Sequence, residues 1–237
     1  QRFTVADWVR LAEQAIAEIA SRGKVPLITG GTGLYINALI DGFLFPDHSA
    51  DENLRKQLYE KAKADPEGLY RQLQQVDPAT ASRLHPNDHR RIVRALEVYC
   101  ISGRPISELQ AKTPAKQNYK AVMIGLYRTR PLLYQRIEER VDQMIASGLV
   151  TEVKTLLEQY PHQPTALQAI GYKEIALYLQ NRLTLDEAAA LIKRETRRYA
   201  KRQLSWFRRD HRIKWYDLDH TTTAEIIADT KERLGNL

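Results

Sequence analysis

The spacing of apolar residues changes along this chain, and each spacing predicts a different element. Residues 4–22 place apolar side chains at helical intervals and begin with Thr4, a good N-cap, so they predict an amphipathic helix. Residues 25–29 form a short apolar run, which predicts a strand buried on both faces of a parallel sheet. A glycine-rich turn at 30–33 leads into a second predicted helix at 34–40. This order of elements is typical of an α/β fold.

Strand-like alternation is missing from the middle of the chain. Helical patterns separated by Pro or Gly predict the helices of this part, which are 51–64, 66–76, 78–84 and 88–102. Strand character returns at 120–127. We therefore predict a discontinuous α/β core over residues 1–44 and 117–237, interrupted by a helical insertion domain at 46–114. In the second part of the core the pattern predicts a strand at 213–217 and helices at 132–146, 150–159, 172–180, 184–209 and 222–234.

The predicted helix 184–209 carries the strongest charge run, at residues 193–209. Eight of these 17 residues are Lys or Arg, and one is acidic. On a helical wheel, one face holds Ile192, Thr196, Tyr199, Gln203 and Trp206, and the opposite face holds Arg194, Arg197, Arg198, Lys201 and Arg208. A helix docked by one side and cationic on the other suits a polyanion such as a nucleic acid. The alternative is a charged helix that faces only solvent. The net charge of the whole chain, +7, is positive like this helix face and so favours a polyanion as its partner.

Composition narrows the class of protein. The single cysteine, Cys100, excludes a disulfide within the chain and a zinc site built from several cysteines. No apolar run approaches the roughly 20 residues that span a bilayer, and no signal-peptide pattern opens the chain. We therefore expect a cytoplasmic protein in a reducing compartment, with no membrane partner.

Three motifs are candidates for chemistry. The glycine turn could bind an anion through the backbone of Gly30 and Gly31, or it could be a tight turn in which Thr32 caps a helix. Three arginines of the helix at 88–102 could clamp phosphates, namely Arg90, Arg91 and Arg94. Alternatively, that helix could be an exposed one that carries an Arg94–Glu97 pair. At 169–174, Tyr172 and Lys173 could contact a base and a phosphate, or Tyr172 could be a packed residue at a helix start. A Walker A motif, G-x-x-x-x-G-K-[ST], does not occur.

Taken together, the motifs resemble a known family. Five occur in order, at 27–36, 85–98, 136–144, 169–174 and 201–208, and include Leu-Ile-Thr-Gly-Gly-Thr-Gly, Ala-Ile-Gly-Tyr-Lys-Glu and Lys-Arg-Gln-x-x-Trp-Phe-Arg. With them the chain resembles the bacterial tRNA dimethylallyltransferases, also called tRNA isopentenyltransferases, over nearly its whole length. The resemblance implies a P-loop NTPase-like parallel sheet core, incomplete at its N-terminus, with the helical insertion domain. It also implies transfer of a dimethylallyl group from its diphosphate to the N6 amine of the adenosine 3′ to the anticodon.

The resemblance also implies roles for individual residues. Thr32 would lie where diphosphate and flipped adenine meet, and Arg140 would contact the diphosphate as a second catalytic residue. The residues implied to bind tRNA are Arg55, Arg90, Arg91, Arg94, Gln168, Gly171, Tyr172, Lys173, Lys201, Arg202, Gln203, Trp206 and Arg208. Many relatives have Arg at the positions of Gln168 and Lys173, so Gln168 lacks that charge.

The family also has a P-loop and a catalytic Asp, both upstream of the residue that matches Gln1. The P-loop would hold the donor's diphosphate with Mg²⁺, so we expect Mg²⁺ to be required, with ligands outside these 237 residues. We expect this chain alone to be inactive and the enzyme to act as a monomer on tRNA and dimethylallyl diphosphate. Two alternatives remain, an isopentenyltransferase of free adenine nucleotides and a non-catalytic RNA-binding fragment.

Overall fold

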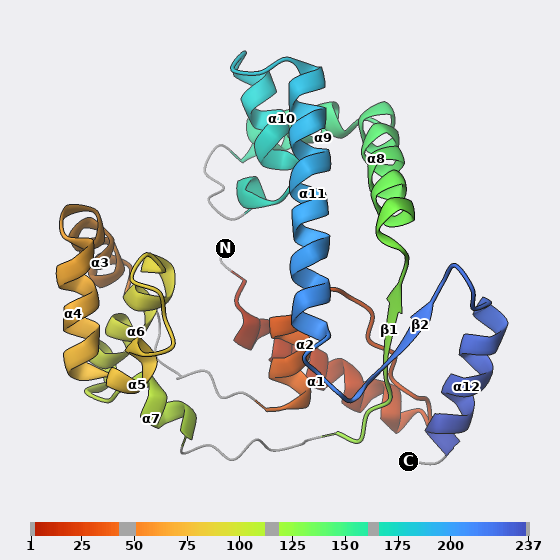
Figure 1. Ribbon diagram of the computed structural model, residues 1–237, viewed down its shortest axis with the longest axis horizontal. Coiled ribbons are helices and arrows are strands. Elements are labelled where there is room, and N and C mark those ends of the chain that lie inside the picture. The colour runs from red at the N-terminus through yellow and green to blue at the C-terminus, as the bar shows by residue number, and fades with distance from the viewer. Residues whose placement is uncertain (1–2, 43–50, 112–118, 161–165, 236–237) are drawn as a thin grey trace. The chain divides into compact units, whose positions relative to one another are not determined.

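The computed structural model describes residues 3–42, 51–111, 119–160 and 166–235, and its contacts divide them into two compact units (Figure 1). The first unit comprises residues 1–3, 27–33 and 120–237, and the second comprises 4–26 and 34–119. The predicted domain limits at 44–46 and 114–117 fall among residues outside the described ranges. These limits stay a prediction.

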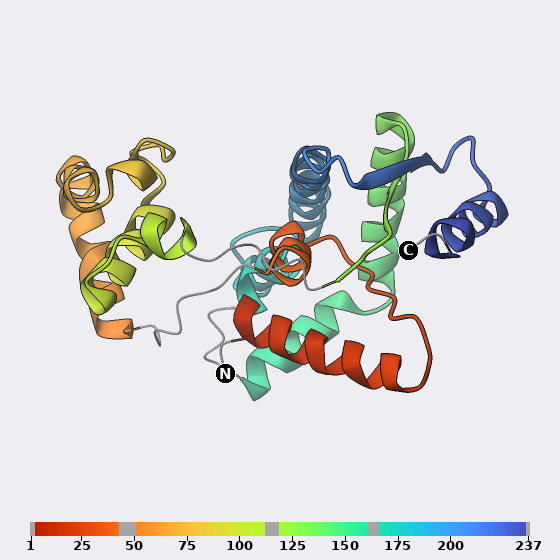
Figure 2. The ribbon, with the colours of Figure 1, turned by 90° about the horizontal axis from the view of Figure 1, so that it is seen from below.

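The regular elements among the described residues of the second unit are all helices. Its helices are α1 (Val5–Ser21), α2 (Gly33–Ile40, with Gly33 counted in the first unit), α3 (Glu52–Ala64), α4 (Pro66–Val76), α5 (Pro78–Ala81), α6 (His89–Ser102) and α7 (Ile106–Ala111). Thr4 is the N-cap of α1, as predicted, and it forms a capping box in which the Thr4 hydroxyl accepts from the Asp7 N–H and the Asp7 carboxylate accepts from the Thr4 N–H. Figure 2 shows α1 in side view. The predicted helix at 88–102 is confirmed as α6, with Asp88 as its N-cap.

One apolar core holds α3 to α6 together. It includes Leu58, Leu73, Ile92, Val93 and Leu96, all of which are buried. These side chains recur at helical intervals on α3, α4 and α6, so each helix turns one apolar stripe inward. Polar residues on the other faces of these helices take no part in this core and can contact a ligand.

The first unit combines a small sheet with a helical layer. Its elements are β1 (Met123–Tyr127), α8 (Arg130–Ala146), α9 (Leu149–Gln159), a 3₁₀ turn (Ala166–Gln168), α10 (Tyr172–Leu179), α11 (Leu185–Phe207), β2 (Ile213–Asp217) and α12 (Thr223–Gly235). The strands β1 and β2 pair in parallel, with Met123 opposite Ile213 and Tyr127 opposite Asp217. A parallel pair joined through helices confirms the α/β class. In both ribbon views α12 lies beside β2 (Figures 1 and 2), where the Tyr216 hydroxyl donates to the Asp229 carboxylate.

In the first unit, α8 and α10 pack against α11. Buried side chains of α8, α9, α10 and α11 form one core, which contains Val141, Val153, Ile175, Ala188 and Ile192. In Figure 1, α11 runs as a long straight rod between α10 and α8. Thr184 caps α11 and forms a capping box with Glu187, which fixes the start of the helix.

One predicted element is wrong. Residues 25–29 form no strand, and Val25 and Leu27 are 67% and 82% exposed. An apolar run becomes a strand only where another strand takes up its backbone hydrogen bonds, and no described strand pairs with this segment. Among the described residues, no helix is both long and apolar enough to cross a membrane.

Candidate functional site

The loop that carries Thr32 is fastened to α11. The side chain of Gln203 donates a hydrogen bond from Nε2 to the Gly31 carbonyl oxygen at 3.0 Å. The hydroxyl of Tyr199, one turn earlier on α11, lies 3.5 Å from the same oxygen. The predicted docked face of this helix is thus confirmed at Tyr199 and Gln203, and its partner is the glycine turn.

Two glycines of the loop are needed because α11 comes so close. A Cβ at Gly31 would lie 2.0 Å from Gln203 Nε2, and one at Gly33 would lie 2.2 Å from the Trp206 ring. Neither glycine has a positive φ, so close approach rather than turn geometry explains both residues. A Cβ at Gly30, by contrast, would meet nothing within 4 Å.

Thr32 stands between these two contact points. Its side chain is exposed, and no described group forms a hydrogen bond with its hydroxyl. Since Gly31 and Gly33 are both held against α11, the backbone of Thr32 is held on either side. The hydroxyl is therefore exposed on a segment whose backbone is held, and its predicted role toward the reacting groups stays a prediction.

The cations of α11 divide between packing and solvent. Arg197 donates to the Glu138 carboxylate of α8 at 2.6 Å and lies over the Tyr134 ring, and Lys193 pairs with Asp142 at 2.6 Å. The prediction that Arg197 belongs to a free cationic face is therefore wrong. A helical wheel places a residue on a face but does not show that α8 covers part of that face.

Other cations of α11 remain toward solvent. Arg194 and Arg198 both pair with Glu195. Burial alone would raise the pKa of Glu195, but the hydrogen bonds and positive charges of the two arginines outweigh it and lower that pKa. Arg202 lies over the Tyr199 ring. Lys201 and Arg208 are exposed, and no described carboxylate pairs with either. Lys201 and Arg208 could therefore bind a polyanion without first breaking an ion pair within the described residues.

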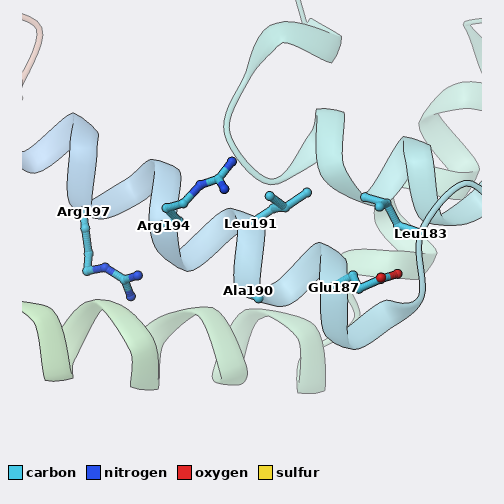
Figure 3. A pocket seen from close by; sticks show the side chains of 6 residues that line it. All are labelled: Leu183, Glu187, Ala190, Leu191, Arg194 and Arg197. Atoms are coloured by element: carbon cyan, nitrogen blue, oxygen red, sulfur yellow. The ribbon is translucent and has the colours of Figure 1, made fainter.

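A shallow hollow on α11 lies away from this loop (Figure 3). It is lined by Leu183, Glu187, Ala190, Leu191, Arg194 and Arg197. In Figure 3, Arg197 points toward α8, drawn in green, and Arg194 points away from it. The lining residue nearest the loop, Arg197, precedes Gln203 by six residues, which is roughly 9 Å along a helix. The lining of the hollow does not include Tyr199, Gln203 or Trp206, which approach the loop.

The segment 168–173 turns sharply into α10. Gly171 is buried with φ of +102°, a conformation that favours glycine, and its N–H donates to Glu174 at 2.9 Å. The Tyr172 hydroxyl donates to the Glu152 carboxylate, and this hydrogen bond raises the pKa of Tyr172. Lys173 and Gln168 are exposed. The packed-tyrosine alternative describes Tyr172 well, while the tRNA contacts of this segment stay a prediction.

In the second unit, two predicted RNA-binding arginines share one buried partner. Arg55 Nη2 and Arg94 Nη1 donate to the same Glu97 oxygen, Oε2, at 2.7 and 2.9 Å. The Glu97 side chain is 0% exposed. The Arg94–Glu97 pair considered in the sequence is therefore present, although α6 is not an exposed helix, because Glu97 belongs to its buried face. Arg90 and Arg91 are exposed, and Arg91 pairs with Asp88.

Comparison with known proteins decides the family. A model of the IPP transferase family matches residues 1–210. The chain belongs to the IPP transferase family. A tRNA dimethylallyltransferase from Carboxydothermus hydrogenoformans is 51% identical over 228 residues, which cover 95% of this chain and 73% of the relative. One from Moorella thermoacetica is 49% identical, with 95% and 70% covered.

Solved IPP transferase structures agree with the fold. The full-length tRNA isopentenylpyrophosphate transferase from Bacillus halodurans is 40% identical and has a TM-score of 0.67, with 99% of this chain and 74% of that chain covered. A eukaryotic dimethylallyltransferase acting on tRNA has a TM-score of 0.80 at 28% identity, with 100% and 63% covered. The α/β fold with a P-loop-like parallel sheet core is therefore the fold of this family.

The IPP transferase site was only partly predictable. Arg140 lies exposed on α8, two residues from both Glu138 and Asp142, so it faces away from α11 and its diphosphate contact stays a prediction. Sequence reasoning missed the role of Glu97. Its signal was present, because Glu97 follows the buried Val93 by four residues and therefore shares its face of α6.

Proposed function

We propose that this protein transfers a dimethylallyl group from dimethylallyl diphosphate to the N6 amine of the adenosine 3′ to the anticodon in tRNA. One observation carries the proposal. The Thr32 loop is fastened to α11, and the same helix offers Lys201 and Arg208 to a polyanion. A place for reacting groups and a surface for phosphates are thus built on one rigid element. Membership of the IPP transferase family over residues 1–210 supports the same reaction.

The residues suit what this chemistry needs. The amine of adenine is a poor nucleophile, so the protein must align it and exclude competing water. Extracting the base from its stack costs roughly a few kcal/mol, which contacts to the phosphates on either side can offset. We assign those phosphate contacts to the exposed cations of α11 and of the insertion. Thr32 would hold the reacting groups through its hydroxyl.

We also propose that Mg²⁺ accompanies the diphosphate of the donor. Among the described residues, no group of three or more His, Cys, Asp or Glu side chains is placed to hold a metal ion. The contribution that we assign to this chain is to bind and align tRNA and to place Thr32.

The test supplies labelled dimethylallyl diphosphate and Mg²⁺ to the protein expressed from its complete reading frame, with either a tRNA transcript or AMP. We expect label in tRNA and none in AMP. Label in AMP would instead favour an isopentenyltransferase of free nucleotides. Salt-sensitive tRNA binding without any transfer would favour a non-catalytic RNA-binding protein.

Thr32→Ala sharpens this assay. Loss of a hydrogen bond to a charged reacting group should lower kcat by about tenfold or more, while tRNA affinity stays near that of the wild type. The comparison of kcat with the tRNA dissociation constant checks it. A loss confined to tRNA affinity would show that Thr32 contacts the stem and not the reacting groups.

A further inference from the structure

The fully buried carboxylate of Glu97 holds one arginine from each of two helices. Arg55 comes from α3 and Arg94 from α6, and both donate to Oε2. The other oxygen, Oε1, is buried and has no hydrogen-bond partner among the described residues. A buried carboxylate of this kind is stable only when paired, so the two guanidinium groups are fixed by the cost of separating them from it.

The cluster holds more positive charge than its own stability requires. One arginine would neutralise Glu97, but two are present, and the three side chains together keep a net charge of +1. The arginine side chains remain 29% and 35% exposed. An ion pair that only joined α3 to α6 would need neither the second cation nor its exposure to solvent.

The free donors of the two arginines define the ligand. A guanidinium group has five N–H donors in a planar fork, and each arginine uses one of them on Glu97. No other described residue forms a hydrogen bond with either side chain. Two forks with free donors and a net positive charge match the oxygens of a phosphate group. Arg90, one turn before Arg94 on the same helix, adds an exposed cation.

We propose that Glu97 is a positioning residue for tRNA binding, which presents Arg55 and Arg94 as a preformed clamp for one backbone phosphate. This inference rests on the proposed tRNA function. The reason for a buried acid near an RNA surface is then geometric. Its negative charge opposes RNA, yet it removes the rotamer freedom that two long side chains would otherwise lose on binding.

Glu97→Gln separates this role from simple electrostatics. The substitution keeps the shape and adds one net positive charge, so charge alone predicts tighter RNA binding. Positioning predicts the reverse, with affinity for a tRNA anticodon stem-loop lowered by about tenfold and the salt dependence reduced by about one ion. In the transfer assay, KM for tRNA should rise while kcat stays unchanged.

Two further variants decide the matter even if Glu97→Gln does not fold. Arg55→Lys and Arg94→Lys keep the charge and can still pair with Glu97, but each loses the fork, so each should weaken stem-loop binding by several-fold. Arg71→Lys on α4 is the matched control, because Arg71 is exposed and contacts no described acceptor. It should bind as the wild type does.

The outcomes distinguish this inference from the proposed function. A wild-type protein that binds no tRNA overturns both. A wild type that binds tRNA, together with Lys variants that bind equally well, overturns the role of Glu97 alone. Tighter binding by a folded Glu97→Gln variant would also overturn it.

Discussion

The Thr32 loop and the Glu97 cluster both fix the position of exposed functional side chains, but they do so by different means. The loop is held by a neutral hydrogen bond from Gln203 and by the absence of side chains at Gly31 and Gly33. The cluster is held by a buried negative charge between two positive ones. One arrangement depends on size and the other on charge.

This difference shows which substitutions each region tolerates. A loop held by close approach should tolerate changes of charge on the far side of α11 but no added atoms at its glycines. A cluster held by a buried carboxylate should tolerate small changes of volume at its exposed edge but no change in charge at its centre.

The largest effect is expected where an atom is added to the loop. Gly33→Ala would place a Cβ 2.2 Å from the Trp206 ring, so the ring or the backbone must move. Overpacking of this kind costs about 1–3 kcal/mol, and the melting temperature should fall accordingly. Gly30→Ala, whose Cβ meets nothing within 4 Å, should leave the melting temperature unchanged. Equal melting temperatures for the two variants would contradict the close-approach argument.

A smaller effect should separate the packed and the free cations of α11. Lys201→Ala and Arg208→Ala should each reduce the salt dependence of tRNA binding by about one ion, with little change in stability. Arg197→Ala removes the ion pair with Glu138 and the contact with Tyr134, so it should cost about 1 kcal/mol of stability. Its salt dependence should stay that of the wild type. If the salt dependence of tRNA binding were the same in all three variants, α11 would be a solvated charged helix that does not bind RNA through Lys201 and Arg208.

The smallest effect concerns an exposed pair at the end of β2. His220 Nδ1 lies 3.0 Å from the Asp217 carboxylate, whose hydrogen bond and charge raise the pKa of His220. A hydrogen bond from the Asp219 N–H, and then the one from His220, lower the pKa of Asp217. His220 therefore stabilises the fold fully at pH values below its unfolded pKa of about 6.5. This stabilisation is lost as the pH rises through the higher pKa that His220 has in the folded protein.

Asp217 acts with the opposite sign. Its stability is present above an unfolded pKa of about 3.9 and is lost as pH falls through the lowered folded value. The pair is thus fully effective between about pH 4 and pH 6.5. His220→Gln should lower the melting temperature slightly in that window and not at pH 8. A difference that persisted at pH 8 would point to lost packing instead.

Local patterns in the sequence predicted what depends on local interactions. The N-cap at Thr4, the strand at 213–217 and the helix periods involve residues a few positions apart. The exposed segment at 25–29 shows the limit of that reasoning, since an apolar run does not specify a pairing partner. The Arg55–Glu97 pair joins residues 42 positions apart, and no helical wheel contains it.

The hydrogen bond between Gln203 and Gly31 also sets the order in which the protein can be completed. Its two residues are separated by 172 positions, whereas the backbone hydrogen bonds within α11 join residues four positions apart. At the usual pace of synthesis, Gln203 follows Gly31 out of the ribosome after roughly 10–35 s. During that interval the glycine segment has no α11 to bind. The Thr32 loop therefore acquires its shape only after the residues of α11 have been made, and a shorter nascent chain cannot present it.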